Sequence, residues 1–352
     1  TPKMGCCSSK QNRENKYRVS LQGAEMHLEE QNVAPGGRTE SGTFEQTAVR
    51  PDPKDYMFVN ITNDKKVKEP GSINGQAFMI DNCEDSQLYV FDHTAQVTVD
   101  DCTNCCIFLG PVSGSTFIRD CKNCKIVCLT RQLRTRGCHN CEISLHCSTQ
   151  PSIESSSEIS LGCYDLPYKG LKDQLDAAQM SFFQNHWSYV YDFTPKPGNW
   201  SFLPEEATSL SLLRDSDGLR WLSEARNEDV PLVTLRDRKA SFEAYAWLLF
   251  PPSQAKEALP FAQDANKECK FLFTNMAELS AEHITSISEV SGWNQDKLTK
   301  ALLPGKCIGI EVCSDSPLDG VISTAEGLGA FVVRDEEAAT SFRHLGISGS
   351  GR

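Results

Sequence analysis

The feature that most constrains this sequence is a cysteine that recurs at an almost constant spacing. Intervals of 19, 19 and 17 residues separate Cys83, Cys102, Cys121 and Cys138. Between them lie short runs that alternate apolar and polar residues, at 96–100, 115–119, 142–145 and 158–161. Period 2 predicts strands, and a repeat near 18 residues predicts stacked coils, because one such coil cannot bury its apolar side alone. We therefore expect residues 75–164 to form a right-angled or triangular parallel β-helix.

Three of these repeats contain a Cys-x2-Cys pair, which allows two main interpretations. The pairs begin at Cys102, Cys121 and Cys138. Four thiolates at this spacing can bind zinc, but three pairs exceed its four ligands. In a β-helix, equivalent residues of successive coils stack about 4.8 Å apart, so the cysteines would instead form an internal column of small thiols. Ser86, at the partner position of Cys83, suits a column better than a zinc site. We favour the column, with zinc and redox chemistry as alternatives.

Composition excludes several functions. The 352 residues include 35 Lys and Arg against 47 Asp and Glu, a formal charge of −12, so a global basic surface for nucleic acid is absent. No run approaches 18 apolar residues, and the N-terminus has no apolar core of a secretory signal. We therefore expect no transmembrane helix and, despite 16 cysteines, reduced thiols rather than a disulfide framework.

The N-terminus carries a lipidation pattern. Met4-Gly5-Cys6-Cys7-Ser8-Ser9 fits the M-G-x-x-x-[ST] signal, which predicts N-myristoylation of Gly5 when Met4 is the initiator. One myristoyl chain binds membranes only marginally, so S-palmitoylation of Cys6, or also of Cys7, is the expected second anchor. Residues 1–20 hold five Lys or Arg and one Glu, which favours an anionic leaflet. The alternative is an unmodified, solvated tail.

Composition and periodicity divide the chain into four parts. Residues 1–50 are polar and are predicted to be a lipidated, disordered tether, followed by the β-helix at 51–205. An aromatic-rich stretch at 182–200 is expected to pad an open face of the β-helix, although it could also bind a partner. A linker at 206–229 precedes a domain at 230–352, where strand-like runs alternate with helical ones in the manner of a small α/β domain.

Several segments of the β-helix resemble a known family. Phe91-Asp92-His93, the run 97–105 and the run 107–112 are similar to the tubulin-cofactor-C homology domain, and the similarity extends over about 52–203. The resemblance implies a right-handed parallel β-helix. For the C-terminal domain, which matches only in outline, it implies a ferredoxin-like core resembling nucleoside diphosphate kinases.

The same resemblance implies a GTPase-activating protein for Arf-like small GTPases, chiefly Arf-like protein 3, in the trafficking of lipidated proteins to cilia. The family motif Gln-Gln-Leu/Phe-Arg reads Arg-Gln-Leu-Arg at 131–134. Arg134 thus falls on the arginine finger and Gln132 on the second glutamine, while Glu154 matches an acidic residue of the same face. Arg131 replaces the first glutamine, which puts any role of that residue in doubt. The partner GTPase would bind the GTP and magnesium, and no cofactor or metal of this chain is expected.

The resemblance also fixes the remaining expectations. Phosphoryl relay by a nucleoside diphosphate kinase needs a His in an N-x-x-H-G-S-D context, which the sequence around His344 lacks, so no kinase activity is expected. The expected location is the cytoplasmic face of the plasma membrane, at a cilium or basal body. Two rival functions stay open: a tubulin-folding cofactor acting on β-tubulin GTP, and a non-catalytic zinc-binding scaffold.

Overall fold

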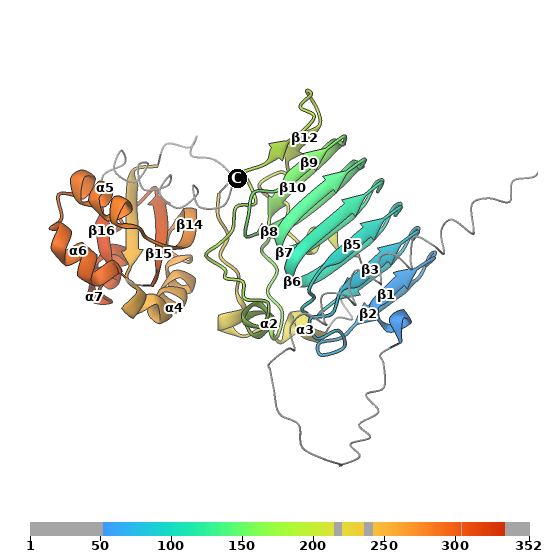
Figure 1. The fold of residues 1–352 in the computed structure, drawn as a ribbon, viewed down its shortest axis with the longest axis horizontal. Coiled ribbons are helices and arrows are strands. Elements are labelled where there is room, and N and C mark those ends of the chain that lie inside the picture. Colours follow the sequence, from blue (N-terminus) through green and yellow to red (C-terminus); the bar gives the residue numbers. More distant parts are fainter. Residues whose placement is uncertain (1–51, 215–219, 236–241, 304, 335–352) are drawn as a thin grey trace, which may run out of the picture. The chain divides into compact units, whose positions relative to one another are not determined.

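The computed structural model describes residues 52–214, 220–235, 242–303 and 305–334. Its first part is a parallel β-helix whose stacked strands are seen in Figure 1. The elements are η1 (Pro53–Tyr56), β1 (Met57–Val59), β2 (Lys65–Lys68), β3 (Phe78–Asp81), β4 (Gln87–Val90), β5 (Val97–Asp100), β6 (Cys106–Arg119), β7 (Lys125–Arg136), β8 (His139–Cys147), β9 (Ser152–Glu154), β10 (Ser157–Cys163), β11 (Tyr191–Asp192) and β12 (Trp200–Phe202). The predicted β-helix is confirmed.

The strands form two parallel stacks. One runs β1, β3, β5, β6, β7, β9 and β11, and the other runs β2, β4, β6, β7, β8, β10 and β12. The long strands β6 and β7 belong to both stacks, because each turns a corner where their register shifts. Inward side chains such as Ile107, Ile126 and Ile143 stack in register and form a continuous core.

Each coil also turns at two left-handed residues three positions apart. The pairs are Asn60/Asn63, Asn82/Asp85, Asp101/Asn104, Asp120/Asn123, Gly137/Asn140 and Ser155/Glu158, with φ from 49° to 65°. Most of these residues are Asn, Asp or Gly, because a Cβ disfavours this conformation and short polar side chains relieve it by local hydrogen bonds. The side chains also join neighbouring coils: the Nδ2 of Asn123 donates to Asn104, and that of Asn140 donates to Asn123.

The cysteines that follow these left-handed residues form two internal columns. One contains Cys83, Cys102, Cys121, Cys138 and then Ser156, and the other contains Ser86, Cys105, Cys124 and Cys141. Every one of these side chains is buried and donates to the carbonyl two residues earlier, at 3.3 to 3.5 Å from sulfur. The column interpretation is therefore confirmed. Cys-x2-Cys is the spacing of two left-handed corners in one coil.

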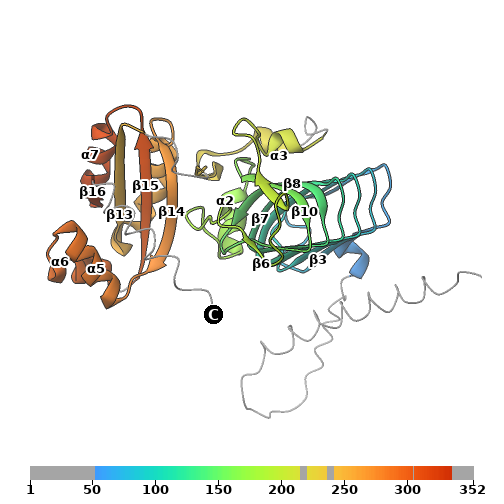
Figure 2. The same cartoon turned by 90° about the horizontal axis from the view of Figure 1, so that it is seen from above.

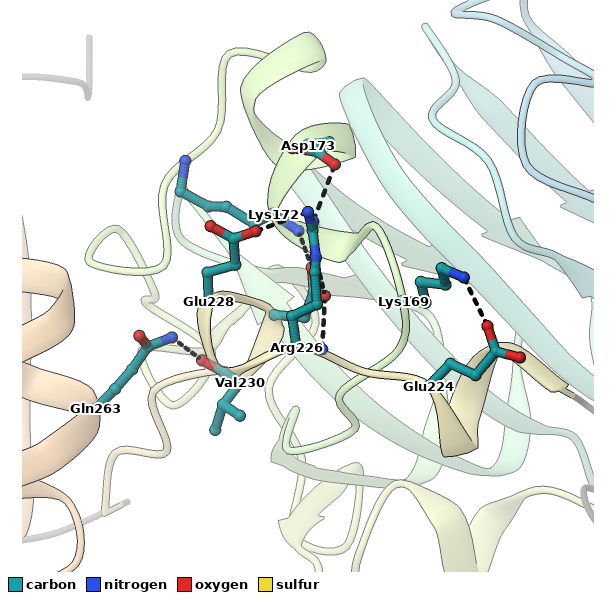
Figure 3. A network of polar contacts seen from close by, with 9 residues as sticks. Lys169, Lys172, Asp173, Glu224, Arg226, Glu228, Val230 and Gln263 are labelled. Carbon is teal, nitrogen blue, oxygen red and sulfur yellow. Dashed lines mark hydrogen bonds and ion pairs between the residues drawn. The ribbon is translucent and has the colours of Figure 1, made fainter.

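Residues 164–190, 203–214 and 220–235, here called the arm, cover the outer side of one stack. Its helical elements are α2 (Leu171–Ala177), η2 (Leu210–Leu212), α3 (Arg220–Ser223) and η4 (Asn227–Asp229). Tyr168 packs edge-on against both Phe91 and Phe108. Figure 3 shows how Arg226 fastens the arm to itself, by ion pairs to Asp173 and Glu228. The predicted linker thus includes packed residues, such as the buried Leu212; the predicted domain boundaries stay a prediction.

The C-terminal part is a four-stranded antiparallel sheet in the order β14-β15-β13-β16, and Figure 2 shows these strands side by side. The elements are β13 (Ala244–Phe250), η5 (Pro252–Gln254), α4 (Ala255–Ala265), β14 (Lys270–Glu278), α5 (Ala281–Ser291), α6 (Gln295–Leu302), β15 (Lys306–Ser314), α7 (Asp319–Gly327) and β16 (Phe331–Val333). This order is that of a split βαβ, ferredoxin-like sheet. The sequence pattern predicts a helix over 276–289, and this prediction is wrong at its start, because 276–278 pair with β15 and α5 begins at Ala281. Among the described residues, no helix is long and apolar enough to cross a bilayer.

Candidate functional site

Strand β7 presents Arg134 on the outside of the β-helix. Along this strand, Leu133 and Thr135 point into the core and are buried, while Arg134 and Arg136 are exposed. This alternation follows from the two-residue period of a strand. The backbone of Arg134 is held on both sides, by pairing with Phe117 of β6 and Ser152 of β9. A flexible cationic side chain therefore projects from a rigid backbone.

The guanidinium of Arg134 contacts an aromatic face. It lies over the Phe117 ring, with 5.9 Å between its central carbon and the ring centroid. Within the described parts of the chain, Arg134 makes no ion pair and no side-chain hydrogen bond. Its charge and its N–H donors are therefore available to a ligand or partner.

Gln132 lies on the same face as Arg134, two residues earlier. The Oγ of Ser115 donates to its Oε1 at 3.0 Å, and Ser115 is its partner in the register of β6 and β7. This hydrogen bond orients the amide, so that its NH2 group points away from Ser115. The resulting surface combines amide and guanidinium donors.

Glu154 completes the group of residues that the sequence singled out. It lies on β9 and is exposed, and it pairs in register with Arg136, whose Nε is 3.9 Å from its Oε1. Its carboxylate is therefore a diagonal neighbour of Arg134 on the same face. The structure brings Gln132, Arg134 and Glu154 together on one side of the β-helix.

Arg131 is bound differently from the other arginines of β7. Its Nε donates to the carbonyl of Ser113 at 2.6 Å, and its Nη2 donates to the carbonyls of Ala178 and Gln179, both at 3.3 Å. These two carbonyls close helix α2, where a cation is favoured by the helix dipole. Arg131 therefore fastens the arm to the β-helix and leaves few donors for a partner.

Two aromatic residues extend the same face beyond Glu154. Tyr191 is 50% and Phe193 is 61% exposed, and their rings meet edge to face at 4.7 Å between centroids. Tyr191 pairs with Ser152, and the amide of Phe193 donates to the carbonyl of Ile153. Core packing, the expected role of the aromatic stretch, holds for Phe182, Phe183 and Trp187 but is wrong for this pair. The local sequence gave no signal of this exposure, because aromatic, polar and aromatic residues at strand period predict that the two rings face the core.

The site is chemically suited to an anion presented by another molecule. Exposed donors and one aromatic pair lie on the face of a sheet, and Arg134 can extend from it. Across the described ranges, no group of three or more His, Cys, Asp or Glu residues has the arrangement of a metal site. Gly5, Cys6 and Cys7 lie outside the described residues, and their lipidation stays a prediction.

The β-helix matches a known domain family, and a longer stretch of the chain matches known proteins. Residues 75–193, which include Gln132, Arg134, Glu154 and Phe193, match the tubulin binding cofactor C family. The β-helix is thus a cofactor C domain. Protein XRP2 of Danio rerio is 36% identical over 282 residues, covering 78% of this chain and 75% of that protein. For XRP2 of Mus musculus the identity is 39% over 254 residues, covering 70% and 69%. The chain belongs to the XRP2 family.

Three further matches cover smaller parts of this chain. XRP2 of Homo sapiens is 44% identical over 206 residues, which cover 56% of this chain and 59% of that protein. Tubulin-folding cofactor C of Arabidopsis thaliana is 29% identical over 145 residues, or 40% of this chain and 36% of that protein. The solved tubulin binding cofactor C from Leishmania major aligns with 35% of this chain and 86% of its own, at 23% identity and a TM-score of 0.32.

Proposed function

We propose that this protein is a GTPase-activating protein for an Arf-like small GTPase of the Arf-like protein 3 type. The observation that carries the proposal is the exposed guanidinium of Arg134, which has no ion pair within the described residues and stands beside Gln132 and Glu154. Membership of the XRP2 family supports it, together with the resemblance of 131–134 to the finger motif.

Arg134 would act in trans. During GTP hydrolysis negative charge accumulates around the transferred phosphoryl group, and a planar, permanently charged guanidinium stabilises it. Fingers of this kind accelerate hydrolysis by about 10³ to 10⁵. Gln132 would orient the finger or contact the GTPase, and Glu154 would pair with a basic residue of the partner. Tyr191 and Phe193 supply exposed apolar area next to the finger, which suits the core of a docking surface. GTP and magnesium belong to the partner.

The proposal extends to the tail and to the location. Myristate on Gly5 and palmitate on Cys6, with Cys7 as a second possible site, would tether the protein to the cytoplasmic face of the plasma membrane, at a cilium or basal body. Hydrolysis there would reset a GTPase that unloads lipidated proteins. Cell fractionation tests the anchor: Gly5→Ala should move the protein from the membrane to the cytosol, whereas unchanged fractionation would contradict it.

The decisive experiment is single-turnover GTP hydrolysis by Arf-like GTPases with saturating protein. Arg134→Ala should lower the stimulated rate by about 10³ or more. Lys125→Ala is the matched control, since it removes one positive charge from the start of the same strand, where Lys125 pairs with Glu142 in the other stack. It should leave the rate within a factor of about two. Equal rates for wild type and Arg134→Ala would refute the proposal.

A tubulin-folding cofactor acting on β-tubulin GTP is the second candidate. The match to the Arabidopsis cofactor favours it, and the same Arg134 would be its catalytic side chain. The assay discriminates the two when tubulin replaces the Arf-like GTPase. A zinc-binding scaffold is the third candidate, for which metal analysis of the purified protein is the test; the hydrogen-bonded thiol columns favour neither zinc nor a catalytic role for the cysteines.

A further inference from the structure

Strand β6 pairs in parallel with β7, the strand that carries Arg134, and residues 115–119 of β6 pair one by one with residues 132–136 of β7. Ser115 pairs with Gln132, and Phe117 pairs with Arg134. The two β6 side chains contact the two β7 side chains, through the Ser115 hydrogen bond at 3.0 Å and the Phe117 ring at 5.9 Å. Gln132 and Arg134 thus each contact a side chain of the preceding coil.

The neighbouring arginines show that the support of Arg134 is unusual. Arg119 binds Asp100 through two hydrogen bonds, at 2.7 and 2.6 Å, and Arg136 approaches Glu154 at 3.9 Å. These residues occupy the row next to Arg134, because they lie two positions further along the same strands. The carboxylates of this face are therefore shared with other arginines, and Arg134 rests on an aromatic ring.

An aromatic ring and a carboxylate can both orient a guanidinium, but they differ in whether its N–H donors and its charge remain available. A carboxylate accepts the N–H donors in the guanidinium plane and neutralises the charge. A ring attracts the cation through its face, so the in-plane donors and the charge stay available. A free arginine side chain samples many rotamers, and part of that conformational entropy is lost on insertion. The Phe117 ring therefore reduces the entropy that Arg134 loses on insertion and leaves its N–H donors and its charge available.

We propose that Phe117 is a positioning residue for Arg134, and that Ser115 has the same role for Gln132. This inference rests on the proposed function and deepens it. Phe117 restricts the guanidinium to orientations from which it can enter the active site of a GTPase, and it touches neither the nucleotide nor the partner's reacting atoms. Its loss lowers the rate of the chemical step and leaves the affinity for the GTPase unchanged.

The test is a double-mutant cycle in single-turnover GTP hydrolysis, with the full chain and a GTP-loaded Arf-like GTPase. Phe117→Leu should lower the saturated rate about two- to fivefold, which is the effect of losing an exposed cation–π contact. The protein concentration at half-saturation should not change. Phe117→Tyr, which keeps the ring, should restore the rate. In the Arg134→Ala background, Phe117→Leu should have no further effect, because the supported group is gone.

Controls separate positioning from folding. Phe202→Leu removes a half-buried ring elsewhere in the β-helix, one that packs against Trp187 and Trp200, and should leave the rate unchanged. Phe117→Met keeps more side-chain length if the leucine variant fails to fold. An unchanged rate for folded Phe117→Leu or Phe117→Met, or an equal loss in the Arg134→Ala background, would overturn the inference. Loss of the Arg134→Ala effect itself would instead refute the proposed function.

Discussion

The Nε of Arg131 donates to the carbonyl of Ser113 at 2.6 Å, and this contact distinguishes Arg131 from Arg134 on the same strand. Arg131 and Arg134 are three residues apart on β7, and both are exposed. The guanidinium of Arg131 donates to three backbone carbonyls of its own chain. Among the described residues, the guanidinium of Arg134 has no hydrogen-bond acceptor. Arg131 is therefore held by its own chain, whereas the charge of Arg134 is available to a partner.

Arg131→Gln, which restores the glutamine of the family motif, should affect stability more than activity. The shorter amide cannot reach all three carbonyls, and losing charge-assisted hydrogen bonds should lower the free energy of unfolding by about 1 to 3 kcal/mol. Chemical denaturation measures this loss. The stimulated rate of GTP hydrolysis should fall far less than with Arg134→Ala; a comparable fall would mean that Arg131 also acts on the GTPase.

Cys121 tests the thiol column. Its Sγ donates to the carbonyls of Arg119 and Val99, at 3.3 and 3.6 Å. Cys121→Ser should cost about 1 kcal/mol or less, because Ser86 and Ser156 already make the equivalent bond in other coils. Cys121→Val should cost about 1 to 3 kcal/mol, since it overpacks the corner and loses the donor. Thermal unfolding ranks the two. A serine variant less stable than the valine variant would contradict the hydrogen-bonded column.

The buried His146 and the half-buried His186 predict a loss of stability at mildly acidic pH. Burial lowers the pKa of His146 to about 3, helped by the nearby His186, and burial lowers the pKa of His186 to about 4. Both values lie below 6.5, the ordinary value, so the neutral form is favoured in the folded state. Their contribution is complete above pH 6.5 and is lost as the pH falls. Between pH 7 and pH 5 each should cost about 2 kcal/mol.

Urea denaturation at a series of pH values measures this slope. His186→Phe removes one of the two titrating groups and should reduce the slope between pH 6.5 and pH 5 by about half. His139→Phe is the control, because this histidine is exposed on the surface of the same domain. Parallel curves for wild type and His186→Phe would show that the histidines do not set the acid sensitivity.

Asp229 should hold the arm together. Burial alone raises the pKa of this carboxyl, but hydrogen bonds from the Arg226 guanidinium and from the backbone amides of Lys172 and Arg226 outweigh it, so the net pKa lies below 3.8. Its contribution is therefore complete above pH 3.8 and is lost as the pH falls below that value. Asp229→Ala leaves the half-buried amides of Lys172 and Arg226 without this partner and should cost about 2 kcal/mol at pH 7.

A matched control for Asp229 is Asp176→Ala on α2, whose exposed carboxylate pairs with Lys172. Surface pairs of this kind contribute about 0 to 1 kcal/mol. Thermal unfolding at pH 7 should place Asp229→Ala well below both wild type and Asp176→Ala. Equal midpoints for the two variants would mean that Asp229 does not fasten the arm.

Sequence periodicity determined the β-helix and the place of its cysteines. A repeat near 18 residues with alternating runs can bury its apolar residues only by stacking, and Asn, Asp or Gly before a cysteine marks the left-handed corner. The resemblance of 131–134 also singled out Arg134 and Gln132. The inferences about the β-helix and its cysteines succeeded because they depend on local spacing, which one chain segment contains in full. The roles of Arg134 and Gln132 stay predictions.

Only the tertiary structure decided which partner each side chain has. Spacing along the chain says nothing of Phe117 below Arg134, of Arg131 on the carbonyls of Ala178 and Gln179, or of the exposure of Phe193. These contacts join residues 17 to 48 positions apart, and their geometry depends on coil register and on where the arm returns. The sequence alone thus determined the scaffold, while the stacking of coils and the return of the arm decided that Arg131 binds backbone carbonyls and that Arg134 has no hydrogen-bond partner among the described residues.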